Sequence, residues 1–154
     1  MRHAIEMRIN GETMQLDVES SDVLLDVLRT QLGVKSPKIG CERGDCGSCT
    51  VLIDGRTVRS CLVLGVEADG HEITTVEGIQ HHGLTAVQDM LIERSSFQCG
   101  FCAPGIVLAA AELMESTPHP SAAEVREAIS GNLCRCTGYE PIVEAVVAAA
   151  RGGE

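Results

Sequence analysis

Eight cysteines, arranged as two groups of four, are the residues of this 154-residue chain best suited to chemistry. The first group has the spacing C-x4-C-x2-C, with a fourth cysteine after eleven intervening residues: Cys41, Cys46, Cys49 and Cys61. This is the plant-type 2Fe-2S spacing, in which four thiolates surround a compact anionic core. Gly40, Gly44 and Gly47 lack a Cβ, so the loop can curl and direct backbone N–H groups at sulfur. The first group therefore predicts a 2Fe-2S site whose loop is shaped by these three glycines.

Two other metal sites are alternatives for the first group. Zinc sites with four cysteine ligands are common, but zinc ribbons usually combine two C-x2-C pairs that lie well apart, whereas three of these cysteines share one loop. A Rieske centre needs two histidine ligands, and no histidine lies within either cysteine motif. We therefore expect all five histidines on the solvated surface: His3, His71, His81, His82 and His119. The spacing favours 2Fe-2S over both alternatives.

The second group consists of two close pairs, Cys99 and Cys102 in "FQCGFCAPG" and Cys134 and Cys136 in "GNLCRCTGYEP". A disulfide within the second pair would close a very small, strained ring, so its partners are expected elsewhere in the chain. Each pair precedes a predicted helix, where free N–H groups and the positive end of the helix dipole favour thiolates. The C-x2-C pair alone matches a thioredoxin-type dithiol, which leaves the other pair unexplained. From spacing alone, a zinc site and an iron–sulfur site both remain open.

The aromatic residues of the chain all lie within three residues of a cysteine of the second group, and no tryptophan occurs. They are Phe97, Phe101 and Tyr139. One interpretation is that they shield the second site from water, and the other is that they fill the core nearby. The sequence favours neither.

The first half of the chain must position the first group, and its pattern is that of a mixed sheet with one helix. Apolar residues alternate with polar ones on both sides of Asn10-Gly11 and again around Asp54-Gly55, which predicts two hairpins. Residues 71–76 are typical of a further strand. Asp22 is expected to cap a helix that ends near Gly33. This order of elements resembles the β-grasp of plant ferredoxins.

The second half of the chain changes from a hydrophobic period of two to one of 3.6, which predicts about four helices. Ser121 and Glu124 form a capping-box pattern, and Pro104 and Pro141 stand where helices begin. We therefore predict an α+β protein whose first domain covers 1–77 and whose all-helical second domain covers 84–154. Residues 78–83 are the predicted linker between them.

The charge of the chain limits its partners. It has 12 basic and 22 acidic residues, a formal net charge of -10, which would repel nucleic acids and anionic membranes. The start of the chain shows no secretory signal, and its longest apolar runs are too short to cross a bilayer. The expected location is therefore the reducing cytoplasm, where many cysteines suggest metal or redox chemistry rather than disulfides.

Three motifs in this order, "CERGDCGSCTV", "QCGFCAPG" and "GNLCRCTGY", resemble the small iron–sulfur subunit of the xanthine oxidase family of molybdenum hydroxylases. The resemblance spans nearly the whole chain and extends to subunits of carbon monoxide dehydrogenase, of aldehyde, nicotinate, quinoline and isoquinoline oxidoreductases, and of hydroxybenzoyl-CoA reductase. It implies a β-grasp, plant-type 2Fe-2S ferredoxin-like domain followed by an all-α, four-helix-bundle-like 2Fe-2S domain. The second cysteine group would then hold a second 2Fe-2S cluster.

The resemblance also implies cofactors and partners outside this chain. Family residues matching Gln98 and Cys136 approach the pterin of the molybdenum cofactor, so the helical-domain cluster is expected to be the nearer one, while the N-terminal cluster faces FAD or another acceptor. The implied partners are a large subunit with molybdenum-pterin, its cytosine dinucleotide form left open, and a medium subunit with FAD, in a hetero-oligomer such as a dimer of heterotrimers. Family members often have Thr where this chain has Ala103, a difference expected to be minor because the residue is not a ligand.

The expected function is electron transfer within an oxidoreductase: electrons leave reduced molybdenum, pass the helical-domain cluster and then the N-terminal cluster. No catalytic acid, base or nucleophile is expected on this chain. Because few aromatic side chains are available to seal two clusters, the chain is expected to be an obligate subunit. Two alternatives are a free-standing two-cluster ferredoxin and a zinc-stabilised binding module without redox function.

Overall fold

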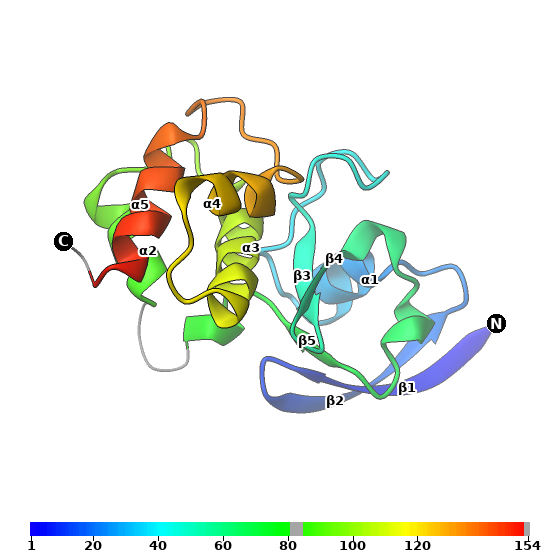
Figure 1. Ribbon diagram of the computed structural model, residues 1–154. Coiled ribbons are helices and arrows are strands. Elements are labelled where there is room, and N and C mark those ends of the chain that lie inside the picture. Colours follow the sequence, from blue (N-terminus) through cyan, green and yellow to red (C-terminus); the bar gives the residue numbers. More distant parts are fainter. Residues whose placement is uncertain (81–84, 153–154) are drawn as a thin grey trace.

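A computed structural model describes residues 1–80 and 85–152 of the chain. Its two parts follow one another in sequence, a five-stranded sheet with helix α1 and then the helices α2 to α5 (Figure 1). The sheet and α5 lie at opposite ends of the molecule. The predicted α+β class, with a sheet domain before a helical one, is confirmed.

The sheet has the strand order β2-β1-β5-β3-β4. Its strands are β1 (Arg2–Ile9), β2 (Glu12–Glu19), β3 (Thr50–Ile53), β4 (Arg56–Arg59) and β5 (Glu72–Thr74). β1 and β5 pair in parallel, whereas the other three pairs are antiparallel. The central place of β5 joins the two hairpins into one sheet.

Both predicted hairpins are confirmed at the predicted turns. Asn10 and Gly11 have φ angles of 51° and 87°, and Asp54 and Gly55 have φ angles of 50° and 81°. Two consecutive residues with positive φ give a tight turn whose twist matches that of the flanking strands, and Asn-Gly and Asp-Gly adopt it readily.

The first helix differs from its prediction at its start. α1 (Leu24–Asp26) continues as a π-helical segment, Val27–Gln31, and its N-cap is Val23, which offers no side-chain cap. The predicted cap by Asp22 is wrong, because that carboxylate turns back and accepts the backbone N–H of Glu19 over 2.8 Å. The Asp22 carboxylate thus closes the turn after β2 and does not cap the helix. Burial of the apolar face therefore holds this helix in place.

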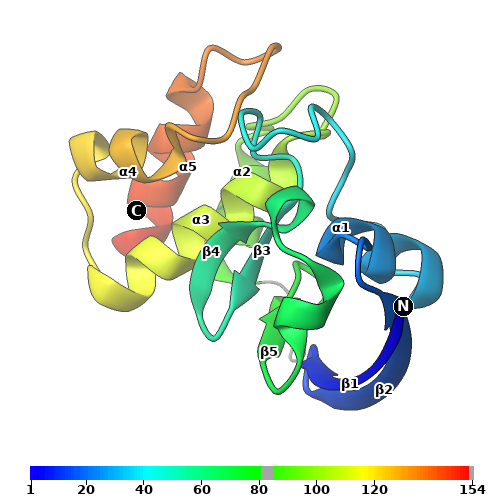
Figure 2. The same ribbon diagram turned by 90° about the vertical axis from the view of Figure 1, so that its right-hand side faces the viewer.

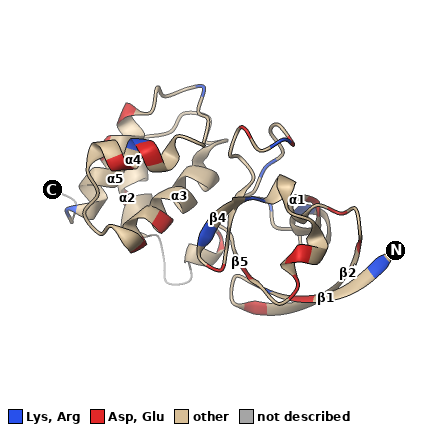
Figure 3. Ribbon diagram, turned by 45° about the vertical axis from the view of Figure 1, so that its right-hand side comes forward, with Lys and Arg blue, Asp and Glu red and all other residues tan. Residues whose placement is uncertain are grey.

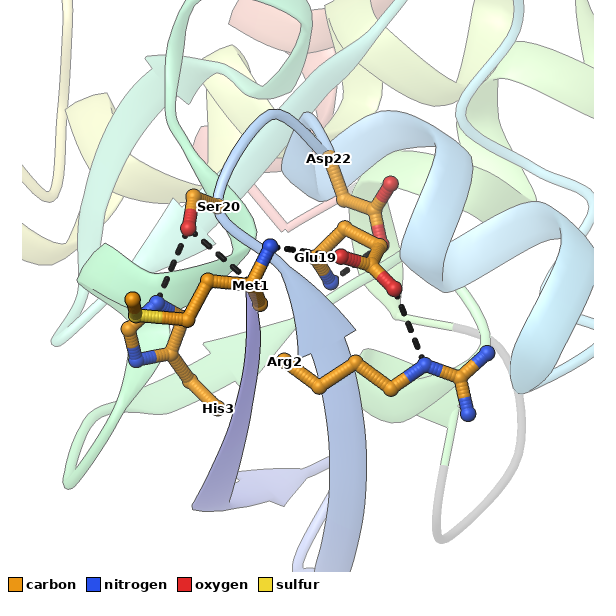
Figure 4. Close-up of polar contacts among 6 residues, drawn as sticks. All are labelled: Met1, Arg2, His3, Glu19, Ser20 and Asp22. Atoms are coloured by element: carbon orange, nitrogen blue, oxygen red, sulfur yellow. Dashed lines mark hydrogen bonds and ion pairs between the residues drawn. The ribbon is translucent and has the colours of Figure 1, made fainter.

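Polar contacts at the beginning of β1 fasten it to the end of β2 (Figure 4). Arg2 Nε and the terminal ammonium of Met1 both contact the Glu19 carboxylate, over 2.9 and 3.1 Å. Ser20 Oγ donates to the Met1 carbonyl over 3.1 Å and lies 2.9 Å from His3 Nε2. These contacts hold together the open end of the hairpin formed by β1 and β2.

The helical part consists of α2 (Ala86–Glu93), α3 (Ala103–Ser116), α4 (Ala122–Ile129) and α5 (Glu140–Ala150). This agrees with the prediction of about four helices.

Local signals set where these helices begin. Ser121 and Glu124 form the predicted capping box of α4, and Thr85 caps α2 in the same way with Gln88. α3 and α5 each carry a proline in the first turn, where a missing N–H costs no hydrogen bond.

Two separate apolar cores stabilise the two parts. The first lies between the sheet and α1 and is centred on Met7, Leu24, Leu28, Val51 and Ile73. The second lies within the helices and includes Ile106, Val125, Ile142 and Val146. Cys102 belongs to the helical core and Cys134 packs against it, whereas Cys49 and Cys61 form a small third cluster with Leu25.

The predicted linker begins as a short 3-10 turn at Gly78–Gln80, and its remainder, 81–83, lies outside the described residues, as does Leu84. Over residues 1–80 and 85–152, no helix is long and apolar enough to cross a bilayer.

Candidate metal centres

The loop before β3 directs backbone N–H groups at a thiol, as its glycines predict. Cys41 Sγ accepts the N–H of Cys46 over 3.4 Å. Hydrogen bonds from the backbone N–H groups of Arg43 and Cys46 lower the pKa of Cys41 to about 7. The loop therefore favours a thiolate at this position before any metal is bound.

Each of the three glycines in this loop has a steric reason to lack a side chain. A Cβ at Gly40 would lie 2.7 Å from Cys46 Sγ. Gly44 has a φ of +88°, and a Cβ there would lie 2.5 Å from Cδ1 of Leu62. Gly47 has a φ of +75°, and its Cβ would lie 2.5 Å from the Gly131 carbonyl oxygen in the other cysteine loop. Gly40 and Gly44 thus shape the first loop, and Gly47 admits the second.

Cys49 and Cys61 form a buried pair at the base of the first site, next to β3 and after β4. Their sulfur atoms are 3.4 Å apart. Burial, together with the neighbouring Cys49 thiol, raises the pKa of Cys61 to about 11. Ser60 Oγ donates to the Cys49 carbonyl over 2.6 Å, which fixes the backbone of one cysteine to the residue before the other.

In the helical part, Cys99 and Cys136 form an exposed pair. Their sulfur atoms are 3.6 Å apart although 37 residues separate them in sequence. The backbone N–H of Phe101 is the main cause of the lowered pKa of Cys99, whereas the hydrogen bond to Cys99 raises that of Cys136. Gln98 Nε2 donates to the Cys136 carbonyl over 2.9 Å, so Gln98 lies at the same exposed edge.

Cys102 and Cys134 are the shielded members of the second group. Burial, and then the neighbouring Cys134, raise the pKa of Cys102 to about 12, even though Cys102 is the N-cap of α3. Burial also raises the pKa of Cys134, but hydrogen bonds from the Thr137 hydroxyl and nearby backbone N–H groups outweigh it, and the net pKa is lowered. The predicted preference for thiolates near helix starts therefore agrees with the lowered pKa of Cys99 and Cys134. It is wrong for Cys102, where desolvation dominates, and for Cys136, whose hydrogen bond with Cys99 raises its pKa.

The thiols approach one another in pairs and not as closed quartets. Among the described residues, no three Cys, His, Asp or Glu side chains converge on one metal position. Two thiolates on one tetrahedral metal ion lie roughly 3.7 Å apart for metal–sulfur bonds of about 2.3 Å. The sulfur–sulfur distances of 3.4 and 3.6 Å fit this value. Thiols that approach in pairs at both sites suit a core of two metal ions better than a single zinc ion.

The three aromatic residues divide between the two interpretations. Phe97 and Tyr139 pack against the helical core, and the Tyr139 hydroxyl accepts the N–H of Cys134 over 2.8 Å. Phe101 is 45% exposed and gives the second site no shield within this chain. Two of them are therefore core residues beside the site.

Three polar residues that the sequence analysis does not single out join the cysteine loops. The buried Asn132 donates from Nδ2 to the Gly47 carbonyl over 3.1 Å and to Thr50 Oγ1 over 3.2 Å. Arg59 donates to the same Thr50 hydroxyl and, across the boundary, to the Gly131 carbonyl over 2.7 Å. Nothing in the sequence pattern points to these residues, since each is a single polar side chain and the bonds that join the two loops connect residues remote in sequence.

One backbone hydrogen bond links the two sites directly. The N–H of Leu133, next to Cys134, donates to the carbonyl of Cys46 over 2.8 Å. Both loops lie at the upper side of the molecule, cyan and orange in Figures 1 and 2. Cys46, a predicted ligand of the first site, is thus one hydrogen bond away from the residue that precedes Cys134, a predicted ligand of the second.

The three described histidines form hydrogen bonds with residues other than the cysteines. His71 Nδ1 lies 2.6 Å from Asp54 Oδ2 at the edge of the sheet, and His119 Nδ1 lies 2.9 Å from the Ala150 carbonyl. His3 contacts Ser20. His81 and His82 lie outside the described residues.

Comparison with known proteins agrees with this geometry. The 2Fe-2S iron-sulfur cluster binding domain matches residues 7–78, and a second family described as a [2Fe-2S] binding domain matches residues 75–147. Together they cover both cysteine groups and nearly all of the chain.

Relatives and a solved structure match over the full length. The nicotine 6-hydroxylase small subunit of Paenarthrobacter nicotinovorans is 45% identical over 95% of this chain and 88% of its own length. The nicotinate dehydrogenase small FeS subunit of Eubacterium barkeri is 42% identical over 92% and 91%. A crystal structure of quinoline 2-oxidoreductase from Pseudomonas putida 86 contains a chain that is 47% identical, with a TM-score of 0.92 and 99% of both chains covered. The chain therefore belongs to the small iron–sulfur subunits of the xanthine oxidase family of molybdenum hydroxylases, and it consists of two 2Fe-2S binding domains.

Proposed function

We propose that this chain is the electron-transfer subunit of a multi-subunit molybdenum hydroxylase. It carries electrons away from a molybdenum-pterin centre on a large partner subunit toward FAD, on a medium subunit, or toward another acceptor. The observation that carries the proposal is the direct contact of the two cysteine loops through the Leu133 N–H and the Cys46 carbonyl. Metal sites that served stability alone would have no need of such a contact.

The cysteines are assigned to two clusters. The first has Cys41, Cys46, Cys49 and Cys61 as ligands, and the second has Cys99, Cys102, Cys134 and Cys136. Each close thiol pair described above is assigned to one iron. A bound 2Fe-2S core supplies reversible one-electron oxidation and reduction, with a potential set by charge, hydrogen bonds to sulfur and solvent exposure. The chain supplies those hydrogen bonds and that burial, and no residue is assigned to bond making or breaking.

The exposure of the second cysteine group favours electron entry at one edge. Cys99 and Cys136 are exposed, whereas Cys102 is buried and Cys134 is partly buried. Gln98 is bonded to the Cys136 carbonyl at the exposed edge. We assign Gln98 and Cys136 to the contact with the pterin, so that electrons enter there and leave toward the junction at Leu133.

The first site then forms the exit. Its buried pair, Cys49 and Cys61, lies at the sheet, while Cys41 lies in a loop whose next residues, Glu42 and Arg43, are exposed. Cys46, whose carbonyl meets the second loop, lies in the same loop. We therefore assign the acceptor to the Cys41 side of the molecule.

Exposed apolar side chains around both sites support the proposal that this chain functions only as a subunit of a larger complex. Ile39, Leu62, Phe101 and Leu133 are 47%, 60%, 45% and 55% exposed, and each lies within two residues of a cysteine. Ile92, 64% exposed, borders an apolar groove of about 400 Å³ between α2 and α3. Leaving such side chains in water is unfavourable, so we assign this surface to contacts with the larger subunits, in a hetero-oligomer such as a dimer of heterotrimers.

The cysteines also bear on the location of the protein in the cell. Eight free cysteines suit a reducing compartment, and we assign the chain to the cytoplasm.

Two alternative functions can be distinguished by purification and metal content. A free-standing ferredoxin would be isolated without large molybdenum- and flavin-containing subunits, whereas the proposed subunit co-purifies with them. A zinc-stabilised module would contain zinc and no acid-labile sulfide.

Metal analysis and electron paramagnetic resonance test the proposal. Two 2Fe-2S binding domains predict four irons and four acid-labile sulfides per chain, with two distinguishable signals after reduction. Cys61→Ser should remove one signal, and Cys136→Ser should remove the other and slow electron entry. Zinc without sulfide, or loss of the same signal in both variants, would contradict the assignment.

A further inference from the structure

A guanidinium group without an acidic partner lies between the two cysteine loops. Arg59 is the last residue of β4, two residues before Cys61. It donates from Nη1 to Thr50 Oγ1 over 2.9 Å and from Nη2 to the Gly131 carbonyl over 2.7 Å. Its Nε is buried and has no hydrogen-bond partner among the described residues. Within the same residues, no carboxylate forms an ion pair with it.

A second cation, that of Lys38, contacts Phe101, which lies between Cys99 and Cys102 of the second cysteine group. Lys38 lies three residues before Cys41, and its backbone N–H donates to the Ser48 carbonyl over 2.9 Å. Its Nζ lies 3.4 Å from the Phe101 carbonyl and 5.4 Å from the centre of the Phe101 ring. In the part of the chain that the structure describes, Lys38 has no ion pair with an acidic residue either.

The absence of an acidic partner is notable in a chain with a net charge of -10. Acidic positions occur in both parts of the molecule (Figure 3), and β4 begins and ends with a basic residue. Arg56, at the other end of β4, is 81% exposed and does pair with Glu112, over 3.7 Å. Shielding part of a cation from water without an anion nearby costs free energy. The surroundings of Arg59 therefore call for an anion that the described side chains do not supply, whereas Lys38 has Glu77 as a more distant acidic neighbour.

We propose that Arg59 and Lys38 form a cationic bridge between the two sites that raises the reduction potentials of the clusters. The inference rests on the proposed function, because it requires both clusters. A 2Fe-2S core held by four thiolates is an anion, and reduction adds negative charge. A nearby cation stabilises the reduced form more than the oxidised form. Arg59 touches both loops, so its charge acts on both clusters, and Lys38 acts mainly on the helical-domain cluster through its contact with Phe101.

Two substitutions separate the effect of the Arg59 charge from that of its shape. Arg59→Gln removes the charge, Arg59→Lys keeps it but loses the planar two-sided fork, and Arg56→Gln removes a paired, exposed charge from the same strand. The measurement is a redox titration of the assembled complex, followed by the two electron paramagnetic resonance signals. In Arg59→Gln, the ratio of reduced to oxidised cluster at a fixed solution potential should fall about tenfold for both centres, a shift of about 59 mV to more negative potential. Arg59→Lys should shift much less, and Arg56→Gln should leave both potentials unchanged.

Each outcome decides the inference. Unchanged potentials in Arg59→Gln, with both signals present, would overturn it while the proposed function stands. An equal shift in Arg56→Gln would also overturn it, since the effect would then be one of overall charge. If Arg59→Gln does not assemble, Lys38→Gln decides: a negative shift of the helical-domain potential supports the bridge, and no shift overturns it. Absence of both signals from the unaltered complex would overturn the proposed function and the inference with it.

Discussion

The backbone of Gly47 is the most crowded point of the candidate site. Its carbonyl accepts the Thr50 hydroxyl over 2.6 Å and the Asn132 amide over 3.1 Å. A Cβ on Gly105, in the first turn of α3, would lie 2.5 Å from the same oxygen. One peptide unit of the first cysteine loop thus touches a helix start and the second cysteine loop.

We expect Gly47→Ala to destabilise the protein more than Gly55→Ala. Both residues have positive φ, of +75° and +81°, so each substitution introduces left-handed strain of about 1–2 kcal/mol. At Gly55 a Cβ has nothing within 4 Å, whereas at Gly47 it lies 2.5 Å from the Gly131 oxygen. Overpacking should raise the loss at Gly47 to about 3 kcal/mol or more. The free energy of unfolding from urea denaturation measures both, and equal losses would contradict the steric account.

The cysteine groups are predictable at the residue scale, whereas the residues that join them are not. The C-x4-C-x2-C spacing and the two pairs are local patterns, so they can be recognised without a structure. Arg59 bonds to the carbonyl of Gly131, 72 residues away, and Asn132 bonds to that of Gly47, 85 residues away. A single arginine in a strand and a single asparagine in a loop carry no periodic signal. Only the folded arrangement shows their role.

At the scale of elements, turns and caps with a strict local geometry were the predictable features. Asn10-Gly11, Asp54-Gly55 and the Ser121 capping box lie where the sequence places them. Asp22 is predicted to cap the helix, but its carboxylate accepts the N–H of Glu19 instead. Sequence alone does not decide between two such local partners.

We expect Ser121→Ala to lower the free energy of unfolding by about 1 kcal/mol, because the Ser121 hydroxyl accepts the N–H of Glu124 at the start of α4. Ser116→Ala is a matched control at the end of α3, where the hydroxyl bonds only to preceding carbonyls. Its effect should be a few tenths of a kcal/mol. A loss in Ser116→Ala as large as that in Ser121→Ala would show that capping is not the cause.

The segment before the first cysteine loop is tied to the end of β5 by Glu77, which makes that tie pH-dependent. Glu77 accepts hydrogen bonds from the Ser36 hydroxyl and from the Thr75 hydroxyl, the latter over 2.6 Å. Burial raises the pKa of Glu77, but these hydrogen bonds outweigh it, so the net pKa is lowered from 4.5. A carboxyl with a lowered pKa in the folded state stabilises the fold above its ordinary pKa and loses that effect as the pH falls through the folded value.

Glu77→Gln should therefore unfold more easily than the unaltered chain at neutral pH, and the difference should shrink below about pH 4.5. Urea denaturation at a series of pH values measures this difference. Glu12→Gln, at the exposed start of β2, is the control and should show no such trend. A difference that grows toward low pH would have the wrong sign for this account.

At the scale of the whole molecule, two independent cores are held together by a small polar junction. The sheet core and the helical core share no residue. The described junction includes Arg59, Thr50 and Asn132 with backbone groups of both loops. The spacing between the two sites therefore depends on these hydrogen bonds together with the packing of α3 against β3 and β4.

Removing the central amide of this junction should weaken the whole molecule. Asn132→Ala leaves the Gly47 carbonyl with one bond fewer in a buried place, and we expect a loss of about 1–3 kcal/mol. Asn132→Asp should lose more, because its carboxylate would face the Gly47 oxygen without a proton to donate. The exposed amide in Gln15→Ala is the control, with little effect on denaturation midpoints. Equal stability of Asn132→Ala and Gln15→Ala would exclude a structural role for the junction.

The hydrogen bond from Leu133 to Cys46 has a consequence for hydrogen–deuterium exchange. The Leu133 side chain is 55% exposed, so its surroundings alone would suggest rapid exchange of its amide. That amide is nevertheless engaged across the boundary between the two halves, and it can exchange only when the loops part. Its exchange rate therefore reports, at a single position in the chain, how often the two cysteine loops separate.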